Sequence, residues 1–321
     1  MKHALKWALP LIGAALFILF MTGWQRDLDP ADLQAKYANS DSQFVDVGEG
    51  VLVHVRDEGK SDAAVLVLVH GSNSSLQAWE PWIPRLAVEY RVITLDLPGH
   101  GLTGPSPARD YSAKAYVKAI DELTRKLGAE KFVIAGHAMG GWIAWHYALA
   151  HPERTSGLIL ISPVGAPGIG APDPPLIFRL EDYPGGRRLA LFVTPRSFIE
   201  KGLRETVSVK SVITDKLVDR YRELLLYPGN RQAALDRTGL LEMEPATLAG
   251  MRHIEVPTLV MAGADNAAVP PSAANWFARA IPGAREIIYP GVGHIPMEEA
   301  PDKTSRDILD FLNALAPPSQ K

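Results

Sequence analysis

Short apolar runs rich in β-branched residues alternate with amphipathic stretches along most of the chain. The run VLVLVH (65–70) is continuous, which is typical of a strand buried on both faces of a parallel sheet. FVDV and VLVHVR instead alternate apolar and polar positions on either side of Gly48 to Gly50, which predicts an antiparallel pair. Five further runs predict buried strands: RVITLD (91–96), KFVIAG (131–136), GLILIS (157–162), PTLVMAG (257–263) and REIIY (285–289).

Helical spacing fills the segments between these strands. Ser112 can cap a helix that ends at Gly128, and a final helix follows the last strand. The apolar positions that follow this spacing are Tyr116, Ile120, Leu123 and Leu127 in the first helix and Ile308, Leu309, Phe311, Leu312 and Leu315 in the final one. Strands that alternate with helices predict an α/β fold with a mostly parallel, doubly wound sheet of eight strands and helices on both faces.

One long region, from about residue 165 to residue 250, interrupts the alternation. It opens with the Pro/Gly-rich stretch GAPGIGAPDPP and continues with helical, charged sequence such as ITDKLVDRYRELLL. A strandless segment of roughly 85 residues is too long for a surface loop of a compact domain. We therefore predict a helical lid over 165–250, inserted into a core formed by 44–164 and 251–316.

The N-terminal segment, 1–25, has the length and composition of a membrane helix. Lys2 and Lys6 precede WALPLIGAALFILFMTGWQ, an uncharged run with tryptophans at both ends. Bulky residues occupy the place where a signal-peptide cleavage site would be expected. We therefore expect a membrane anchor, a linker over 26–43, and a globular domain in the periplasm or outside the cell. Cleavage of the segment would instead give a secreted protein.

Composition excludes several classes of ligand and of chemistry. The chain has 321 residues, of which 47% are hydrophobic and 21% charged, so it can bury a large core. The formal net charge is −3 and no basic run is interleaved with aromatic residues, so we expect no nucleic acid. The absence of cysteine excludes disulfides, thiolate catalysis and cysteine-ligated zinc. We expect small-molecule ligands, no cofactor and no metal.

Polar and glycine-rich segments follow the predicted strands, at the edge where parallel sheets bind ligands. These segments are HGSNS (70–74), DLPGHG (96–101), GHAMGG (136–141), AGAD (262–265) and GVGH (291–294). Acyl transfer requires a nucleophile, a base, an acid that orients the base, and backbone donors for the oxyanion. The centre of GHAMGG, then Asp265, then His294 occur in the chain order nucleophile, acid, histidine.

By these motifs, residues 44–315 resemble the α/β-hydrolase superfamily, in particular its bacterial lidded esterases and carbon–carbon bond hydrolases. HGSNSS resembles the oxyanion loop, DLPGHG the next strand-end loop, and DYSAKAYVKAIDELTRKLG the helix before the nucleophile turn. The resemblance implies that Asp265 is the triad acid and His294 the triad base. It also implies an oxyanion hole formed by the backbone N–H groups of Ser72 and Met139, with Gly71 in the same substrate-binding loop.

The GHAMGG turn departs from the G-x-S-x-G pattern of this superfamily, because Ala138 stands where the serine is expected. A methyl group cannot attack a carbonyl, and loss of the serine in a protease lowers turnover by about 10⁶. We therefore expect the chain to be inactive or impaired. An inactivating Ser→Ala change would leave every other part intact, as the sequence shows. Three alternatives are a pseudoenzyme that only binds, a general-base enzyme that uses His294 and Asp265, and a nucleophile elsewhere, such as Ser72 or Ser74.

The proposed substrate is a small hydrophobic ester or a ketone. Apolar residues of the predicted lid suggest it, although they could equally pack the lid onto the sheet. His137 beside the turn resembles the GHS of many esterases, which favours esters over carbon–carbon bonds. The other histidines are interpreted as packing, surface or loop residues: His54, His100, His146, His151 and His253. Four arginines of the predicted lid could meet a carboxylate, but we interpret them as solvated: Arg179, Arg187, Arg188 and Arg231.

Overall fold

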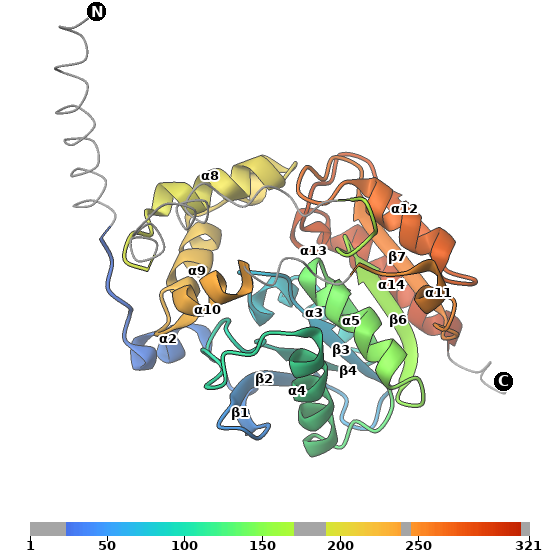
Figure 1. Cartoon of the computed structure of the whole chain (residues 1–321), viewed down its shortest axis with the longest axis horizontal. Coiled ribbons are helices and arrows are strands. Elements are labelled where there is room, and N and C mark those ends of the chain that lie inside the picture. The colour runs from blue at the N-terminus through green and yellow to red at the C-terminus, as the bar shows by residue number, and fades with distance from the viewer. Residues whose placement is uncertain (1–23, 170–190, 239–244, 316–321) are drawn as a thin grey trace, which may run out of the picture.

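The computed structural model describes residues 24–169, 191–238 and 245–315, which contain an eight-stranded sheet (Figure 1). The strands lie in the order β1-β2-β4-β3-β5-β6-β7-β8. The pairs β1·β2 and β2·β4 are antiparallel and all other neighbours are parallel. The strand bounds are β1 (Ser42–Asp46), β2 (Leu52–Gly59), β3 (Val65–Val69), β4 (Arg91–Leu95), β5 (Phe132–His137), β6 (Thr155–Ile161), β7 (Thr258–Gly263) and β8 (Arg285–Tyr289).

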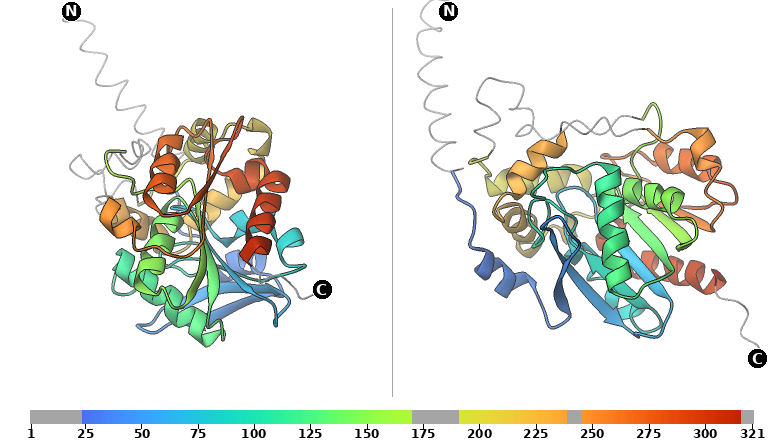
Figure 2. Two further views of the ribbon diagram at one scale, coloured as in Figure 1. Left: turned by 90° about the vertical axis from the view of Figure 1, so that its right-hand side faces the viewer. Right: turned by 60° about the horizontal axis from the view of Figure 1, so that its bottom comes forward.

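Helices cover both faces of the sheet (Figure 2). Helices α4 (Ala113–Lys126), α5 (Met139–Ala150), α11 (Leu248–Met251) and α12 (Pro271–Ala280) pack on one face. Helices α3 (Ile83–Leu86), α13 (Pro296–Glu299) and α14 (Pro301–Leu315) contribute to the core on the other. The predicted α/β fold, with its mostly parallel eight-stranded sheet and helices on both faces, is therefore confirmed.

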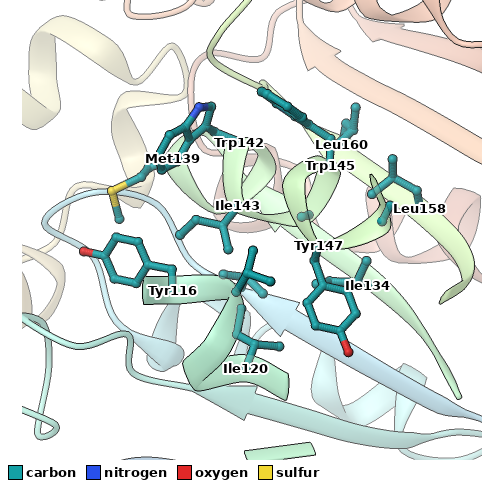
Figure 3. Close-up of a cluster of buried hydrophobic side chains, with 14 of the residues drawn as sticks. Tyr116, Ile120, Ile134, Met139, Trp142, Ile143, Trp145, Tyr147, Leu158 and Leu160 are labelled. Carbon is teal, nitrogen blue, oxygen red and sulfur yellow. The ribbon is translucent and has the colours of Figure 1, made fainter. Parts of the chain in front are cut away.

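The two hydrophobic cores follow from the period of two along each strand. In β3, Val67 and Val69 belong to the core beneath α4 and α5, whereas Leu66 and Leu68 belong to the core beneath α3 and α14. Figure 3 shows the first core, where aromatic side chains of α5 meet α4 and β6. A strand must be apolar on both faces to fill two cores, which explains the continuous runs in the sequence.

Helix α4 begins and ends where its sequence predicts. The Ser112 hydroxyl accepts a hydrogen bond from the Ala115 N–H at 3.3 Å and caps the first turn. Gly128 follows the last turn with φ of 68°, a left-handed conformation that a residue with a Cβ rarely adopts. Between these ends, the buried residues of α4 pack beside α5 over the sheet.

The region between β6 and α11 is helical in its described part. It contains α8 (Arg196–Thr206), η3 (Lys210–Val212), α9 (Asp215–Leu225) and α10 (Asn230–Thr238), and no strand occurs in residues 165–169, 191–238 and 245–250. Figure 1 shows these helices together beside one end of the sheet. The lid boundaries at 165 and 250 stay a prediction. The predicted linker over 26–43 contains α2 (Pro30–Tyr37). A short 3-10 helix, η1 (Leu76–Trp79), follows β3.

The predicted membrane anchor, and the membrane-anchored location derived from it, require a correction. Across residues 24–169, 191–238 and 245–315, no helix is both long and apolar enough to cross a membrane. Residues 1–23, which carry most of the predicted anchor, lie outside the described residues. A membrane anchor is therefore not supported, and we do not retain the predicted location.

The interpretation of Arg231 as a solvated side chain is also wrong. Its guanidinium is buried in α10, donates to Asp27 Oδ1 at 2.6 Å and donates to the Gln25 carbonyl at 3.0 Å. These bonds connect the segment before α2 to the helical region. The other three arginines of that interpretation, Arg179, Arg187 and Arg188, lie outside the described residues.

Candidate active site

The turn between β5 and α5 holds Ala138 in a strained backbone conformation. Its φ is 49° and its ψ is −110°, a region that alanine rarely adopts and that costs about 1–3 kcal/mol. The turn is tight because two glycines allow the backbone to approach closely. A Cβ atom at Gly136 would collide with the Gly140 carbonyl, and one at Gly140 would collide with the Val69 carbonyl. The sequence therefore keeps a sharp strand-to-helix turn around a residue without a reactive atom.

The oxyanion loop predicted at 70–74 lies directly against this turn. A Cβ atom at Gly71 would stand 2.7 Å from His137 Nδ1 and 3.3 Å from the Ala138 methyl carbon, so only glycine fits there. His70 fixes the loop: its Nδ1 donates to the Gly71 carbonyl at 2.7 Å and its Nε2 accepts from the Leu97 N–H at 3.0 Å. The loop, the turn and the end of β4 are therefore one packed unit.

Met139 begins α5, and its N–H belongs to the first helical turn, where no intrahelical acceptor exists. Its side chain lies in the buried cluster with Tyr116 and Trp142 (Figure 3). The roles of the Met139 and Ser72 N–H groups as oxyanion donors stay predictions.

His294 lies in a buried loop after β8, beside the turn. Its ring centroid is 4.7 Å from that of His137, and its carbonyl accepts a hydrogen bond from His137 Nε2 at 2.8 Å. Burial lowers the pKa of His137 to about 4 and that of His294 well below its ordinary value, the latter also through the neighbouring His137. Both imidazoles are therefore neutral at neutral pH, and a neutral imidazole can accept a proton.

Asp265 lies in the adjoining loop, but its carboxylate is not bonded to His294. The Asp265 N–H donates to the Val292 carbonyl at 3.0 Å, which joins the two loops. Its side chain is exposed, and Oδ2 accepts from the Ser208 hydroxyl at 3.2 Å. Within the described part of the chain, the buried Nδ1 of His294 has no hydrogen-bond partner. The structure thus brings these loops together without the acid–base hydrogen bond, and both roles stay predictions.

Glu299 organises the His294 loop, and sequence reasoning did not identify it. Its carboxylate is buried and accepts from the N–H groups of Gly293 at 2.9 Å and Ile295 at 3.1 Å. It also accepts from the N–H groups of Ser208 at 2.8 Å and Val209 at 2.9 Å, in the helical region. In the sequence, Glu299 is marked only as an acidic residue five positions after His294. A single acidic residue forms no periodic pattern and no motif.

A second network, around Asp96, was also missed. Asp96 Oδ2 accepts from His54 Nδ1 at 2.8 Å and Oδ1 accepts from the Leu76 N–H at 2.8 Å, with both side chains fully buried. Burial alone would raise the pKa of Asp96, but His54 and the N–H donor hold it below its ordinary value. His54 Nε2 accepts from the Ser42 hydroxyl at 2.9 Å. This network fixes the start of DLPGHG to β1, β2 and η1.

Comparisons with known proteins identify the family of this chain. Residues 64–301 match the family described as alpha/beta hydrolase fold, and the chain belongs to that family. A 2-hydroxy-6-oxononadienedioate/2-hydroxy-6-oxononatrienedioate hydrolase of Comamonas testosteroni is 27% identical over 283 residues, which cover 84% of this chain and 96% of the relative. A monoacylglycerol lipase of Xenopus laevis is 25% identical over 319 residues, which cover 94% of this chain and 88% of the relative.

Solved structures share the fold. A serine-to-alanine mutant of a meta-cleavage product hydrolase from Pseudomonas fluorescens, complexed with acetates, superposes with a TM-score of 0.75 at 24% identity. The match covers 87% of this chain and 100% of that one. The two relatives described above are hydrolases by name, which supports an α/β hydrolase here.

Proposed function

We propose that this chain is an ester hydrolase of the α/β-hydrolase fold in which Ala138 has replaced the nucleophilic serine of a Ser–His–Asp triad. The observation that carries the proposal is the strained backbone at Ala138. Alanine gains nothing from φ of 49°, and such strain concentrates at functional positions where the surrounding structure imposes it. A serine at this position would present its hydroxyl at the end of β5, beside Gly71.

In this proposal His294 is the general base and Asp265 the acid that orients it. The position of His294 next to His137, which contacts Gly71 at the turn, supports the first role. The Asp265 carboxylate would have to leave Ser208 and turn toward His294 Nδ1, which has no other partner in the described structure. The hydrogen bond between their loops keeps that change local to one side chain.

The helical region at 165–250 serves as the lid in this proposal. Its contacts with the site loops support the role: the Thr206 carbonyl accepts from the His294 N–H at 3.0 Å, and Ser208 binds Asp265. Arg220 of α9 also forms two hydrogen bonds with Glu298, four residues after His294. We favour hydrolysis of a small hydrophobic ester over cleavage of a carbon–carbon bond, because His137 stands directly before residue 138, as in the GHS sequence of many esterases.

The test is the Ala138→Ser variant with p-nitrophenyl butyrate as substrate. We expect hydrolysis at least about 10³ times faster than that of the unaltered chain, given the 10⁶-fold effect of the serine elsewhere. Ala138→Gly is the matched control, because it changes the same position without adding a hydroxyl. His294→Ala in the Ala138→Ser background should remove the gain.

Two outcomes would contradict the proposal. Equal rates of p-nitrophenyl butyrate hydrolysis by the Ala138→Ser and Ala138→Gly variants would show that a serine at position 138 does not act as a nucleophile. Hydrolysis by the unaltered chain that His294→Ala abolishes would instead support a general-base enzyme without a covalent step.

A further inference from the structure

A small cleft lies beside the oxyanion loop, between loops 73–75 and 99–101 and the helices α9 and α10. None of its lining residues is acidic, and two of them, Arg220 and Arg237, are arginines. The two guanidinium groups differ in their partners, and this difference suggests what the cleft binds.

Arg220 is neutralised within the protein. Its Nη2 donates to both carboxylate oxygens of Glu298, at 2.9 and 2.8 Å, and both side chains are largely buried. A paired arginine of this kind holds two elements together and leaves little charge for a ligand.

Arg237 forms no ion pair of this kind within the described residues. Its Nη1 donates to the Gly99 carbonyl at 3.0 Å and its Nη2 donates to Asn73 Oδ1 at 3.3 Å. Its Nε is buried without a hydrogen bond, and no carboxylate in the described part of the chain forms an ion pair with it. Asp236, the preceding residue of α10, is instead bound by Arg109.

The nearby Asp236 and the rings of Tyr111 and Tyr116 compensate the charge of Arg237 only in part. Arg237 is only 6% exposed, and a buried charge without a counter-ion is destabilising. Burial lowers the pKa of Arg237, because loss of water around the guanidinium disfavours its charged form. A neutral donor such as glutamine could satisfy the Gly99 carbonyl equally well, so hydrogen bonding to the loop does not require the charge. Bidentate recognition of a carboxylate does require it.

The cleft is also close to the proposed reaction centre. A Cβ atom at Gly71 would stand 3.3 Å from the Ala138 methyl carbon, and Asn73, which lines the cleft, is two residues further along the same loop. A residue spans at most about 3.6 Å of chain. Asn73, where the cleft begins, therefore lies within roughly 10 Å of the Ala138 methyl carbon. One small molecule could therefore reach both places.

We propose that Arg237 binds a carboxylate at the far end of the substrate, so that the substrates are monoesters of short dicarboxylic acids. The inference rests on the proposed ester hydrolysis and adds the substrate class to it. The ester carbonyl would lie at residue 138 and the free carboxylate in the cleft.

Binding to the unaltered chain tests this inference without any need for turnover. The probes are monophenyl glutarate, which carries a carboxylate, and methyl phenyl glutarate, which carries a neutral ester in its place. Isothermal titration should show at least tenfold tighter binding of the carboxylate. Equal affinities for the two probes would overturn the inference.

Variants assign the preference to Arg237. Arg237→Gln should bind the two probes equally, whereas Arg204→Gln, an exposed arginine of α8, should keep the full preference. Arg237→Lys keeps a charge without the planar fork and should keep part of the preference, which provides a test if the Gln variant does not fold. A preference that survives in a folded Arg237→Gln variant, or that is absent from a folded Arg237→Lys variant, would overturn the inference.

The two proposals fail separately. If Ala138→Ser gains esterase activity but the carboxylate preference is absent, the role of Arg237 is wrong and the hydrolase proposal stands. If the preference depends on Arg237 but Ala138→Ser gains no activity, the cleft binds carboxylates and the hydrolase proposal is wrong.

Discussion

The carboxylate of Glu299 holds the loop on both sides of His294. Oε1 accepts a hydrogen bond from the N–H group of Ile295, and Oε2 accepts from that of Gly293 and from two N–H groups of the proposed lid. One buried side chain therefore sets the position of the proposed base relative to the helices above it. Hydrogen bonds from N–H groups to an ionised carboxylate are among the stronger ones in proteins.

We predict that Glu299→Ala lowers the free energy of unfolding by about 3–5 kcal/mol, because several buried N–H groups lose their acceptor at once. Glu299→Gln should have a smaller effect, since one oxygen remains. Urea denaturation measures both values. Glu89→Ala, at an exposed glutamate, is the control and should change the free energy by less than about 0.5 kcal/mol. Equal effects at the two positions would contradict the role given to Glu299.

The ion pair between Arg220 and Glu298 connects the proposed lid to the segment after His294. Both side chains are largely buried, so removal of one charge leaves the other without a partner. We predict that Glu298→Gln lowers the free energy of unfolding by about 3 kcal/mol. The matched control is Glu200→Gln, which removes the partly exposed ion pairs of Glu200 with Arg196 and Arg204 within α8 and should have an effect below about 1 kcal/mol. Thermal or urea denaturation that ranks the two variants the other way would contradict this prediction.

Acid should destabilise the protein through its buried neutral histidines. The pKa of His137 is lowered by burial to about 4, whereas an unfolded histidine takes up its proton near pH 6.5. Between these values the unfolded state binds more protons, so the free energy of unfolding falls as the pH falls from 6.5 toward 4. His137 alone should contribute roughly 3 kcal/mol over this window.

The measurement is urea denaturation at several pH values for the unaltered chain and for His137→Gln. The variant should lose less stability between pH 6.5 and 4 than the unaltered chain. His253→Gln, at an exposed histidine, should leave the pH dependence unchanged. Parallel curves for the unaltered chain and His137→Gln would show that His137 does not remain neutral in the folded protein.

Much of the fold could be predicted because it depends on local patterns. The apolar runs locate every strand of the sheet, and most strand ends lie within two residues of the predicted ones. Ser112 and Gly128 mark the ends of α4. The turn at Ala138 was visible because close backbone approach demands glycines at fixed positions on either side. These features depend on residues near one another in sequence, so their periods and spacings are informative.

The polar partners of the site could not be predicted in the same way. Asp96 binds a histidine 42 positions earlier, and Arg220 binds a glutamate 78 positions later. Such pairs depend on which strands and helices become neighbours, and a single charged residue leaves no periodic signal. Arg231 was misinterpreted for this reason, because its partner Asp27 precedes the sheet altogether. Glu299 lies near His294 in sequence, yet only the folded loop shows what its carboxylate binds.

The central claim is that residue 138 occupies the position of a nucleophile. Its most direct test is covalent labelling of the Ala138→Ser variant by a fluorophosphonate probe, with the modified peptide identified by mass spectrometry. We predict one adduct at residue 138, no adduct in the unaltered chain, and strongly reduced labelling when His294→Ala is added. An unlabelled but folded Ala138→Ser variant, or an adduct on Ser72 or Ser74 of the unaltered chain, would contradict the claim.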